Sequence, residues 1–382
     1  MGLRWVAKRV MAHRYHTLPL LDTNQLVLKG MPFEGTIPSR DYMEYITVRQ
    51  QTGRNFFSPR KRMQGHVLPS VSPFDNVLAH CMARWLLVDY KLNAYPYFDL
   101  NILTVYTDLP QSLRFSRMIL NYYEQTVPQE LYQRINFFLL PLHSTNGVKV
   151  DVPDPKITVM QDGMFSYSPT FRIEDPVYIM MANDVLRHLS QDYVRRLPSL
   201  EWEQRYFDFL PDGSRSERFS REIDYWCNVT LKNLASALEA SKVSETYIPT
   251  RLVQLFTLLE KCAPEHKLIA IDAAQRQKPS SMSSIFQSWF GSGARRFKAF
   301  EPNGPSDPLR SEEATSFVSD FSEVRKIYAS VYDGTKICQS EELADFAGNW
   351  LDLEESEQIL GDKDLALRAR WMKNADIDVL YS

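Results

Sequence analysis

Asp99-Leu-Asn-Ile-Leu-Thr-Val-Tyr106 and Ile135-Asn-Phe-Phe-Leu-Leu140 are two short apolar runs, and a helical pattern from Pro110 to Thr126 lies between them. Branched and aromatic side chains dominate both runs, which is typical of β-strands. Apolar residues predominate in both runs and do not alternate regularly with polar ones, so we expect both faces of each strand to be buried. Two such strands joined by a helix predict an α/β sheet.

The same alternation extends in both directions from this unit. Before it, apolar residues spaced three and four apart predict a helix from Pro73 to Lys91. After it, apolar runs predict strands at 157–160, 177–182 and 267–271, with helices from about 183 to 195 and over 252–262. Strands that alternate with helices indicate a parallel sheet covered on both faces. The predicted fold class is therefore α/β.

Two stretches interrupt the alternation. The first, at about 202–248, is too long for a simple crossover; it combines a charged segment with a helical pattern, and we interpret it as a helical insertion. The second, at about 278–298, is rich in serine and carries a few aromatic residues. Its composition predicts a flexible surface loop. A lid over a substrate or partner is the alternative.

Composition and charge exclude several classes of function. The chain has 382 residues, is 44% apolar and carries a net charge of -3, which argues against wholesale coating of nucleic acid. Its four cysteines lie far apart and its seven histidines show no metal-ligand spacing, so we expect neither a disulfide framework nor a metal site. The apolar runs are too short for a transmembrane segment, which leaves peripheral membrane association open.

The first 21 residues differ from the rest of the chain. They contain Arg4, Lys8, Arg9 and Arg14, and the first acidic residue is Asp22. An arginine-rich, acid-free segment with its apolar residues on one helical face is typical of a mitochondrial transit peptide. We therefore expect residues 1–21 to be removed on import into the mitochondrial matrix. An ordinary exposed helix is the alternative.

The strand ends lack the residues that usually hold a nucleotide-like cofactor. Such a site needs glycines after the first strand and an acid after the second, which binds the ribose hydroxyls. Here the first turn reads Thr107-Asp108-Leu109-Pro110, and no glycine occurs between Gly65 and Gly147. The second strand ends in Leu142-His143, without a carboxylate. These features argue against a dinucleotide or S-adenosylmethionine pocket of ordinary design.

Six short segments nevertheless occur in a characteristic order: Gly35-Thr-Ile-Pro-Ser-Arg-Asp-Tyr-Met43, Gly53-Arg-Asn-Phe-Phe57, Ser70-Val-Ser-Pro-Phe74, Met181-Ala-Asn-Asp-Val-Leu-Arg187, Ile269-Ala-Ile-Asp272 and Ser319-Asp-Phe321. In this order they resemble motifs of the MidA-like family of mitochondrial and bacterial S-adenosylmethionine-dependent protein arginine methyltransferases. The resemblance implies a seven-strand, Rossmann-like methyltransferase domain over 99–382. An N-terminal helical segment, 22–98, would precede it.

The chain departs from the family pattern at three places. The glycine-rich turn after the first strand is replaced by Thr104 to Pro110, the acid after the second strand is missing, and Arg187 stands where the family has an acid. These changes lead to the hypothesis of a degenerate methyltransferase fold acting as a non-catalytic binding or regulatory factor. Its role would lie in mitochondrial gene expression, including translation, or in complex assembly. The alternative is an active S-adenosylmethionine-dependent protein arginine methyltransferase.

Four acidic or amide residues are candidates for a cofactor site of this kind. Asn183 and Asp184 follow a strand and could line a pocket or cap a helix. Asp272 ends another strand and could face the same cleft or lie in a solvated turn. Asp108 could replace a lost ligand contact, although an acid before Pro110 also suits a turn. Arg187 could pair with a carboxylate, bind an anion or lie exposed on a helix.

One basic and aromatic cluster follows the transit segment. Its members are Arg54, Phe56, Phe57, Arg60, Lys61 and Arg62. Aromatic rings stack on unpaired bases while cations neutralise phosphates, so the cluster could contact RNA. A solvated basic loop is the alternative. The expected partner is a mitochondrial protein or RNA.

Overall fold

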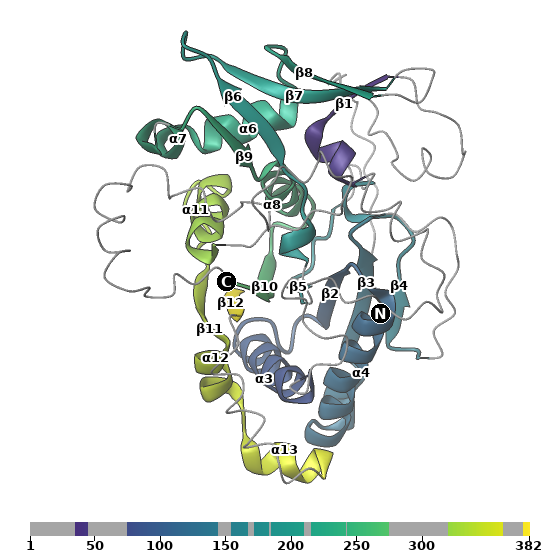
Figure 1. The fold of residues 1–382 in the computed structure, drawn as a ribbon. Coiled ribbons are helices and arrows are strands. Elements are labelled where there is room, and N and C mark those ends of the chain that lie inside the picture. The colour runs from purple at the N-terminus through teal and green to yellow at the C-terminus, as the bar shows by residue number, and fades with distance from the viewer. Residues whose placement is uncertain are drawn as a thin grey trace.

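The computed structural model describes residues 35–44, 75–143, 154–166, 172–182, 185–209, 215–241, 243–274, 320–361 and 377–382. Within these ranges the chain forms two sheets (Figure 1). The larger sheet has seven strands in the order β11 (Gln339–Glu342), β12 (Ile377–Tyr381), β10 (His266–Ala273), β5 (Val177–Met181), β2 (Leu100–Tyr106), β3 (Ile135–Pro141) and β4 (Ile157–Val159).

Five neighbouring strands of the large sheet are parallel. β2 pairs with β3 from Leu100 opposite Ile135 to Tyr106 opposite Pro141, and it pairs with β5 on its other side. β10 continues the parallel set beside β5, and β4 continues it beside β3. Only β12 runs antiparallel, between β10 and β11. The prediction of an α/β fold with a seven-strand, methyltransferase-like sheet is confirmed.

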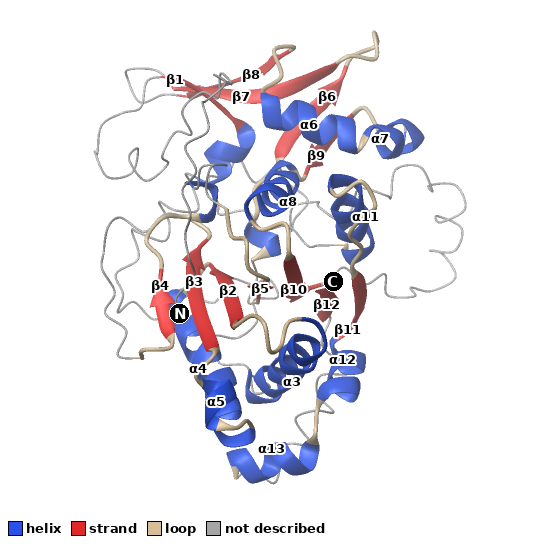
Figure 2. Ribbon diagram, turned by 180° about the vertical axis from the view of Figure 1, so that it is seen from behind, coloured by secondary structure: helices blue, strands red, loops and turns tan. Residues whose placement is uncertain are grey.

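Helices cover both faces of the large sheet (Figure 2). One face carries α3 (Asp75–Asn93), α4 (Leu109–Thr126) and α12 (Leu343–Trp350), whose apolar residues form one core with the inward side chains of β2 and β3. The shorter helices α5 (Gln129–Tyr132) and α13 (Leu353–Leu360) lie at its margin. The other face carries α8 (Thr250–Cys262) and α11 (Phe321–Val331). Two buried layers of this kind explain why the central strands are predominantly apolar.

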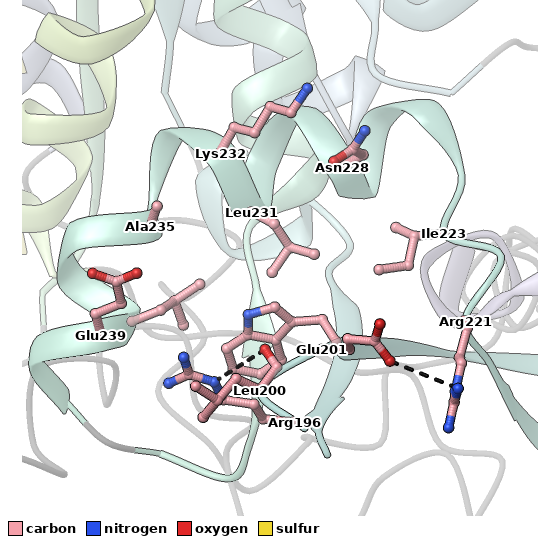
Figure 3. A pocket seen from close by; sticks show the side chains of 12 residues that line it. Arg196, Leu200, Glu201, Arg221, Ile223, Asn228, Leu231, Lys232, Ala235 and Glu239 are labelled. Carbon is pink, nitrogen blue, oxygen red and sulfur yellow. Dashed lines mark hydrogen bonds and ion pairs between the residues drawn. The ribbon is translucent and has the colours of Figure 1, made fainter. Parts of the chain in front are cut away.

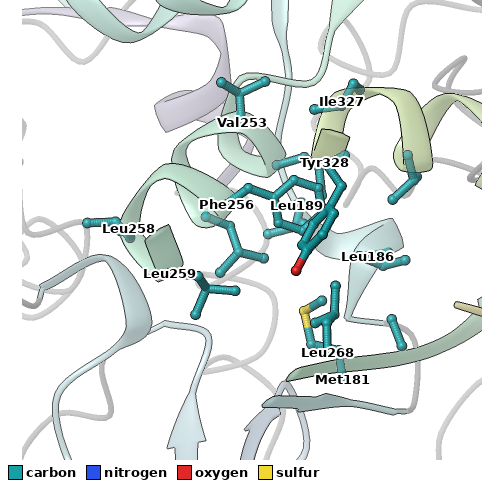
Figure 4. Packing of buried hydrophobic residues seen from close by; sticks show 14 of the residues in the cluster. Met181, Leu186, Leu189, Val253, Phe256, Leu258, Leu259, Leu268, Ile327 and Tyr328 are labelled. Carbon is teal, nitrogen blue, oxygen red and sulfur yellow. The ribbon is translucent and has the colours of Figure 1, made fainter. Parts of the chain in front are cut away.

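The core under α8 and α11 is built from aromatic and branched side chains. Phe256 of α8 meets Tyr328 of α11 edge to face, with ring centroids 5.1 Å apart. Figure 4 shows both rings above Met181 and Leu268, which come from the sheet. All four side chains are almost completely buried. This packing fixes β5 and β10 side by side, which matters because the residues after both strands belong to the candidate site.

A second, smaller sheet lies above the carboxyl ends of the central strands (Figure 1). Its strands run in the order β1 (Gly35–Pro38), β7 (Trp202–Phe209), β6 (Asp192–Arg196) and β9 (Glu245–Ile248), while β8 (Arg215–Ser220) also pairs with β7. All its pairings are antiparallel. Helices α6 (Tyr225–Asn233) and α7 (Ala235–Ser241) accompany it. The stretch 202–248 thus contains helices as expected, together with strands that its sequence did not reveal.

The predicted helix from about 183 to 195 is wrong. Its described part forms a single 3-10 turn, Leu186–His188, followed by β6. β6 is held by antiparallel pairing to β7 and β9 on its two sides. Asp192 and Val194 point inward while Tyr193 and Arg195 are half-buried, which is the two-residue period of a strand. Long-range pairing overrode the local helical spacing here.

Candidate functional site

The large sheet changes its winding direction at β2. The chain leaves β2 through α4 toward β3 on one side, whereas β5 lies on the opposite side. Open α/β sheets bind ligands outside the carboxyl ends of their strands at such a switch point. The described side chains that follow these strands are therefore the candidates: Asp108 after β2, His143 after β3, Arg187 and His188 after β5, and Asp272 at the end of β10.

Arg187 and Asp272 form a buried ion pair across the ends of β5 and β10. The Nε atom of Arg187 lies 3.1 Å from Oδ1 of Asp272, and the backbone N–H of Arg187 donates to Oδ2 at 3.0 Å. Both side chains are buried. Of the three possibilities for Arg187, pairing with a carboxylate is confirmed. Asp272 is buried at the end of β10 and does not lie in a solvated turn, and its charge is balanced by this guanidinium.

Asp108 has a local structural role at the start of α4. Its carboxylate accepts a hydrogen bond from the backbone N–H of Gln111 at 3.0 Å, and Pro110 occupies the first turn of the helix. This is the geometry of a helix N-cap, which satisfies one of the free N–H groups at a helix start. The turn interpretation of Asp108 is therefore confirmed, and the cap holds the turn that follows β2.

Two histidines that the sequence analysis did not assign lie at the same edge. The Nε2 atom of His143 and the Nδ1 atom of His188 are shielded from solvent, and neither has a hydrogen-bond partner among the described residues. Burial lowers the pKa of His188 to about 4, with smaller contributions from His143 and Arg187. Burial also lowers the pKa of His143, partly opposed by Glu44. Both imidazoles are consequently neutral at physiological pH.

Residues 39–44 lie beside this edge and are held there by a buried network of charged side chains around Arg251 of α8. The Arg251 guanidinium binds Glu44 with Nε to Oε1 at 2.6 Å, and it reaches Asp41 with Nη2 to Oδ1 at 2.9 Å. Ser190 donates its hydroxyl to the same Glu44 oxygen at 2.6 Å. Burial alone would raise the pKa of Glu44, but the Arg251 charge and these hydrogen bonds lower it.

A second buried network of charged and polar side chains connects residues 39–44 to the small sheet. The Nη1 atom of Arg40 lies 2.5 Å from Oδ2 of Asp192 in β6 and 2.8 Å from Oδ2 of Asp224, which caps α6. Gln204 of β7 also donates to Asp192, at 3.0 Å. Residues 35–44 are thus fixed between α8 and the small sheet by charges that are almost fully buried. The sequence signal for this arrangement was the run Ser39-Arg40-Asp41, whose partners lie about 150 residues or more away.

Several predicted positions lie outside the described residues. These are Asn183 and Asp184, the segments 1–21 and 278–298, and the cluster Arg54, Phe56, Phe57, Arg60, Lys61 and Arg62. His143 could have been found from the sequence, because it stands where the acid after the second strand was sought. The structure adds its unpartnered nitrogen, which no sequence pattern reveals.

The small sheet contains a separate pocket of about 490 Å³ (Figure 3). Leu231 and Ile223 point into it from α6 and the segment before it. Trp202, at the start of β7, also lines it. Arg196 lies over the Trp202 ring, with its guanidinium carbon 5.6 Å from the ring centroid. None of the residues that follow the central strands lines this pocket.

Comparisons with known proteins place the fold in a family. The family described as "Putative S-adenosyl-L-methionine-dependent methyltransferase" matches residues 81–288. A Saccharomyces cerevisiae protein named "Protein arginine methyltransferase NDUFAF7 homolog, mitochondrial" is 30% identical over 399 residues, covering 98% of each chain. The chain belongs to this methyltransferase family. The resemblance stated from the six sequence segments is thereby confirmed.

A solved structure has a fold similar to that of this protein. A Burkholderia thailandensis protein crystallised with S-adenosyl-homocysteine superposes with a TM-score of 0.52 at 12% identity, covering 95% of this chain and 93% of that one. At this identity the likeness extends to the fold alone. In the described part of this methyltransferase-family chain, no group of three or more His, Cys, Asp or Glu side chains is placed to hold a metal ion. No described helix is long and apolar enough to cross a membrane.

The hydrogen-bonding side chains at the carboxyl edge of the large sheet suit an uncharged polar group of a ligand. Arg187 and Asp272 neutralise each other, whereas the shielded nitrogens of His143 and His188 lack protein partners among the described residues. Buried polar atoms in native proteins are nearly always hydrogen-bonded, to protein, water or ligand. The hydroxyl-bearing nucleoside of S-adenosylmethionine would supply such partners. The turn after β2 lacks the usual glycines, so a cofactor would rely on these side chains more than on a bare backbone.

Proposed function

We propose that this protein is an S-adenosylmethionine-dependent methyltransferase that modifies arginine in a protein substrate in the mitochondrial matrix. Three observations support the proposal: family membership, 30% identity to a yeast protein with that name over nearly the whole chain, and a seven-strand sheet with polar side chains at its switch point. The arginine-rich segment 1–21 supports import into mitochondria.

The observation that carries the proposal is the pair of shielded, unpartnered imidazole nitrogens of His143 and His188 at the carboxyl edge. A scaffold that had lost its ligand would gain stability by filling this edge with apolar side chains, because an unsatisfied buried polar atom costs about 1–3 kcal/mol. The chain instead keeps polar atoms there. Residues 39–44 are held beside the same edge by the hydrogen bonds from Arg251 to Asp41 and Glu44.

Two measurements test the proposal on the full chain. In the first, S-adenosylhomocysteine is titrated into the protein by calorimetry, and micromolar binding is expected. In the second, radiolabelled S-adenosylmethionine is incubated with the protein and arginine-containing peptides, and acid hydrolysis of the products is expected to release labelled methylarginine. The absence of heat, together with an unchanged Tm at millimolar ligand, would contradict the proposal.

A second candidate is a non-catalytic factor that binds a mitochondrial protein or RNA in gene expression or complex assembly. It is favoured by the missing glycines after β2 and by Arg187, which replaces an acid and neutralises Asp272. This candidate predicts no cofactor binding and a stable partner recovered with the tagged chain from mitochondria. RNA binding would fall steeply with salt and on neutralising Arg60, Lys61 and Arg62 together. Peripheral attachment to a membrane would appear as co-sedimentation with vesicles.

A further inference from the structure

His143 is the second residue after β3, the strand after which nucleoside ligands are normally held by their ribose. In sheets of this kind an acid after the second strand of the nucleotide-binding half binds the ribose hydroxyls. β3 is that strand here, because it follows β2 through α4 and lies directly beside it. The backbone N–H of Leu142 donates to Tyr106 O at 2.8 Å, so the pairing of the two strands continues to the residue before His143. The backbone at His143 is therefore held at the carboxyl end of β3, beside the end of β2.

His143 and His188 approach each other from opposite sides of β2. His143 follows β3 and His188 follows β5, the two strands that flank β2. The charge of His143 influences the pKa of His188, and the charges of Glu44 and Arg251 influence the pKa of His143. Their shielded nitrogens, Nε2 and Nδ1, are unpartnered among the described residues. A ligand over the end of β2 would therefore meet both rings.

The nearby carboxylates are already committed to other groups. Glu44, which is close enough to influence His143, accepts hydrogen bonds from Arg251 and Ser190. Asp272 accepts two from Arg187. The neutral imidazoles, like the Tyr106 hydroxyl at the end of β2, thus keep hydrogen-bonding capacity in the part of the chain described. A neutral imidazole nitrogen either accepts from a hydroxyl or donates to one, which suits an uncharged diol.

We propose that His143 Nε2, with His188 Nδ1 beside it, binds the vicinal ribose hydroxyls of the nucleoside cofactor in place of the missing carboxylate. The assignment rests on the proposed function, because it requires that the adenosyl cofactor bind at this edge. It explains why the family's acid after the second strand could be lost here: a neutral hydrogen-bonding group can contact a diol where a further carboxylate beside Glu44 would suffer charge repulsion.

The test compares two ligands that differ only in these hydroxyls. S-adenosylhomocysteine and its 2′,3′-dideoxyribose analogue are titrated by calorimetry into the full-length wild type and into His143→Ala and His188→Ala. The wild type is expected to bind the dideoxy compound about tenfold or more weakly, since each lost hydrogen bond is worth about 1 kcal/mol. In His143→Ala this difference between the two ligands is expected to disappear, and in His188→Ala to shrink.

A matched control and a second readout keep the test decisive. His80→Ala removes a buried histidine, whose Nδ1 lies 2.9 Å from Ser356 Oγ between α3 and α13, and it should leave the discrimination unchanged. If His143→Ala fails to fold, His143→Gln replaces it and identifies the His143 signal in ¹⁵N-histidine spectra of the wild type. The Nε2 resonance of His143 is expected to shift with S-adenosylhomocysteine and to stay in place with the dideoxy analogue.

The possible outcomes separate the two proposals. A wild type that binds both ligands equally, or a His143→Ala variant that still discriminates between them, overturns the ribose assignment and leaves cofactor binding standing. If the Nε2 resonance of His143 does not shift with S-adenosylhomocysteine, the ribose assignment is likewise overturned, and His143 then binds only buried water. A wild type that binds neither ligand overturns the proposed function and this assignment together.

Discussion

The guanidinium Nε of Arg187 lies 3.1 Å from Oδ1 of Asp272, and the backbone N–H of the same arginine lies 3.0 Å from Oδ2. One carboxylate therefore holds both the side chain and the backbone of the turn that follows β5. Asp272 belongs to β10, so the pair joins the ends of two neighbouring parallel strands. The change of an acid to arginine in this turn, seen in the sequence, is compensated within the protein.

Removing one member of this pair should destabilise the protein strongly. Arg187→Met leaves Asp272 charged and buried, and we expect a loss of about 3–5 kcal/mol in the free energy of unfolding. Urea unfolding followed by circular dichroism measures it. Arg134→Met, which breaks a half-exposed pair with Asp99, is the matched control and should cost about 1 kcal/mol or less. Equal losses in the two variants would contradict the role assigned to the Arg187 pair.

Mild acid should weaken the fold through its buried histidines. Burial lowers the pKa of His188 to about 4 and that of His266 to about 3, whereas the unfolded value is about 6.5. Between these limits the unfolded chain binds more protons, so stability falls as the pH drops below about 6.5, by up to about 1.4 kcal/mol per pH unit for each histidine. Asp41, whose pKa burial raises to about 6, opposes part of this loss.

The histidine contribution can be isolated by substitution. In His188→Gln the free energy of unfolding should fall less steeply between pH 6.5 and 4.5 than in the wild type, as measured by urea unfolding at a series of pH values. Burial and the nearby Lys336 charge lower the pKa of His266, whereas the hydrogen bond that its Nδ1–H donates to Ala263 O at 2.7 Å partly opposes this shift. A wild-type slope in the His188 variant would show that this ring is not titrating in the unfolding reaction.

The cap at Asp108 should have a modest and specific effect. Asp108→Ala removes the acceptor for the Gln111 N–H, and we expect a loss of about 1 kcal/mol in stability, whereas Asp108→Ser should retain most of it. Cofactor affinity should change little in Asp108→Ser, because the cap keeps the turn in place. Loss of S-adenosylhomocysteine binding in the serine variant at unchanged stability would instead assign Asp108 a direct contact with the ligand.

Glu44 should control how tightly residues 39–44 are held. Glu44→Gln leaves Arg251 with less compensation, and we expect faster hydrogen exchange of the 39–44 backbone together with a stability loss of several kcal/mol. Mass spectrometry after proteolysis locates the exchange. Glu203→Gln, which removes the partner of the half-exposed Arg195, is the control and should leave the exchange of 39–44 unchanged. Wild-type exchange in Glu44→Gln would contradict the network.

The sequence was sufficient for the central sheet and insufficient for the small one. The strands 99–106 and 135–140 are predominantly apolar because both faces are buried, and that signal is local. β6 and β7 carry Asp192, Gln204 and Arg205 at buried positions, where they hydrogen-bond to other elements of the fold. Such strands do not show the apolar run that marks a buried strand. The helix expected over 183–195 failed for the same reason.

The candidate site was predictable only in part. Asp108 and Asp272 could be placed at strand ends from the chain pattern, and the pairing of Arg187 was among the possibilities weighed. His143 was visible as the residue that replaces an expected acid. Its significance depends on an unpartnered atom and on a neighbour, His188, that arrives from another strand. Relationships of this kind exist only after the chain has folded.

The place of β12 has a consequence for the life of the protein in the cell. Residues Ile377–Tyr381 are inserted between β10 and β11, which precede them by about 100 and 40 positions in the chain. A chain that stops before residue 377 would therefore expose two unpaired strand edges in the interior of its sheet, and such edges invite aggregation. Truncated or still-growing chains should thus be natural clients of chaperones and quality-control proteases. The large sheet can therefore form in full only after residues 377–381 have been synthesised.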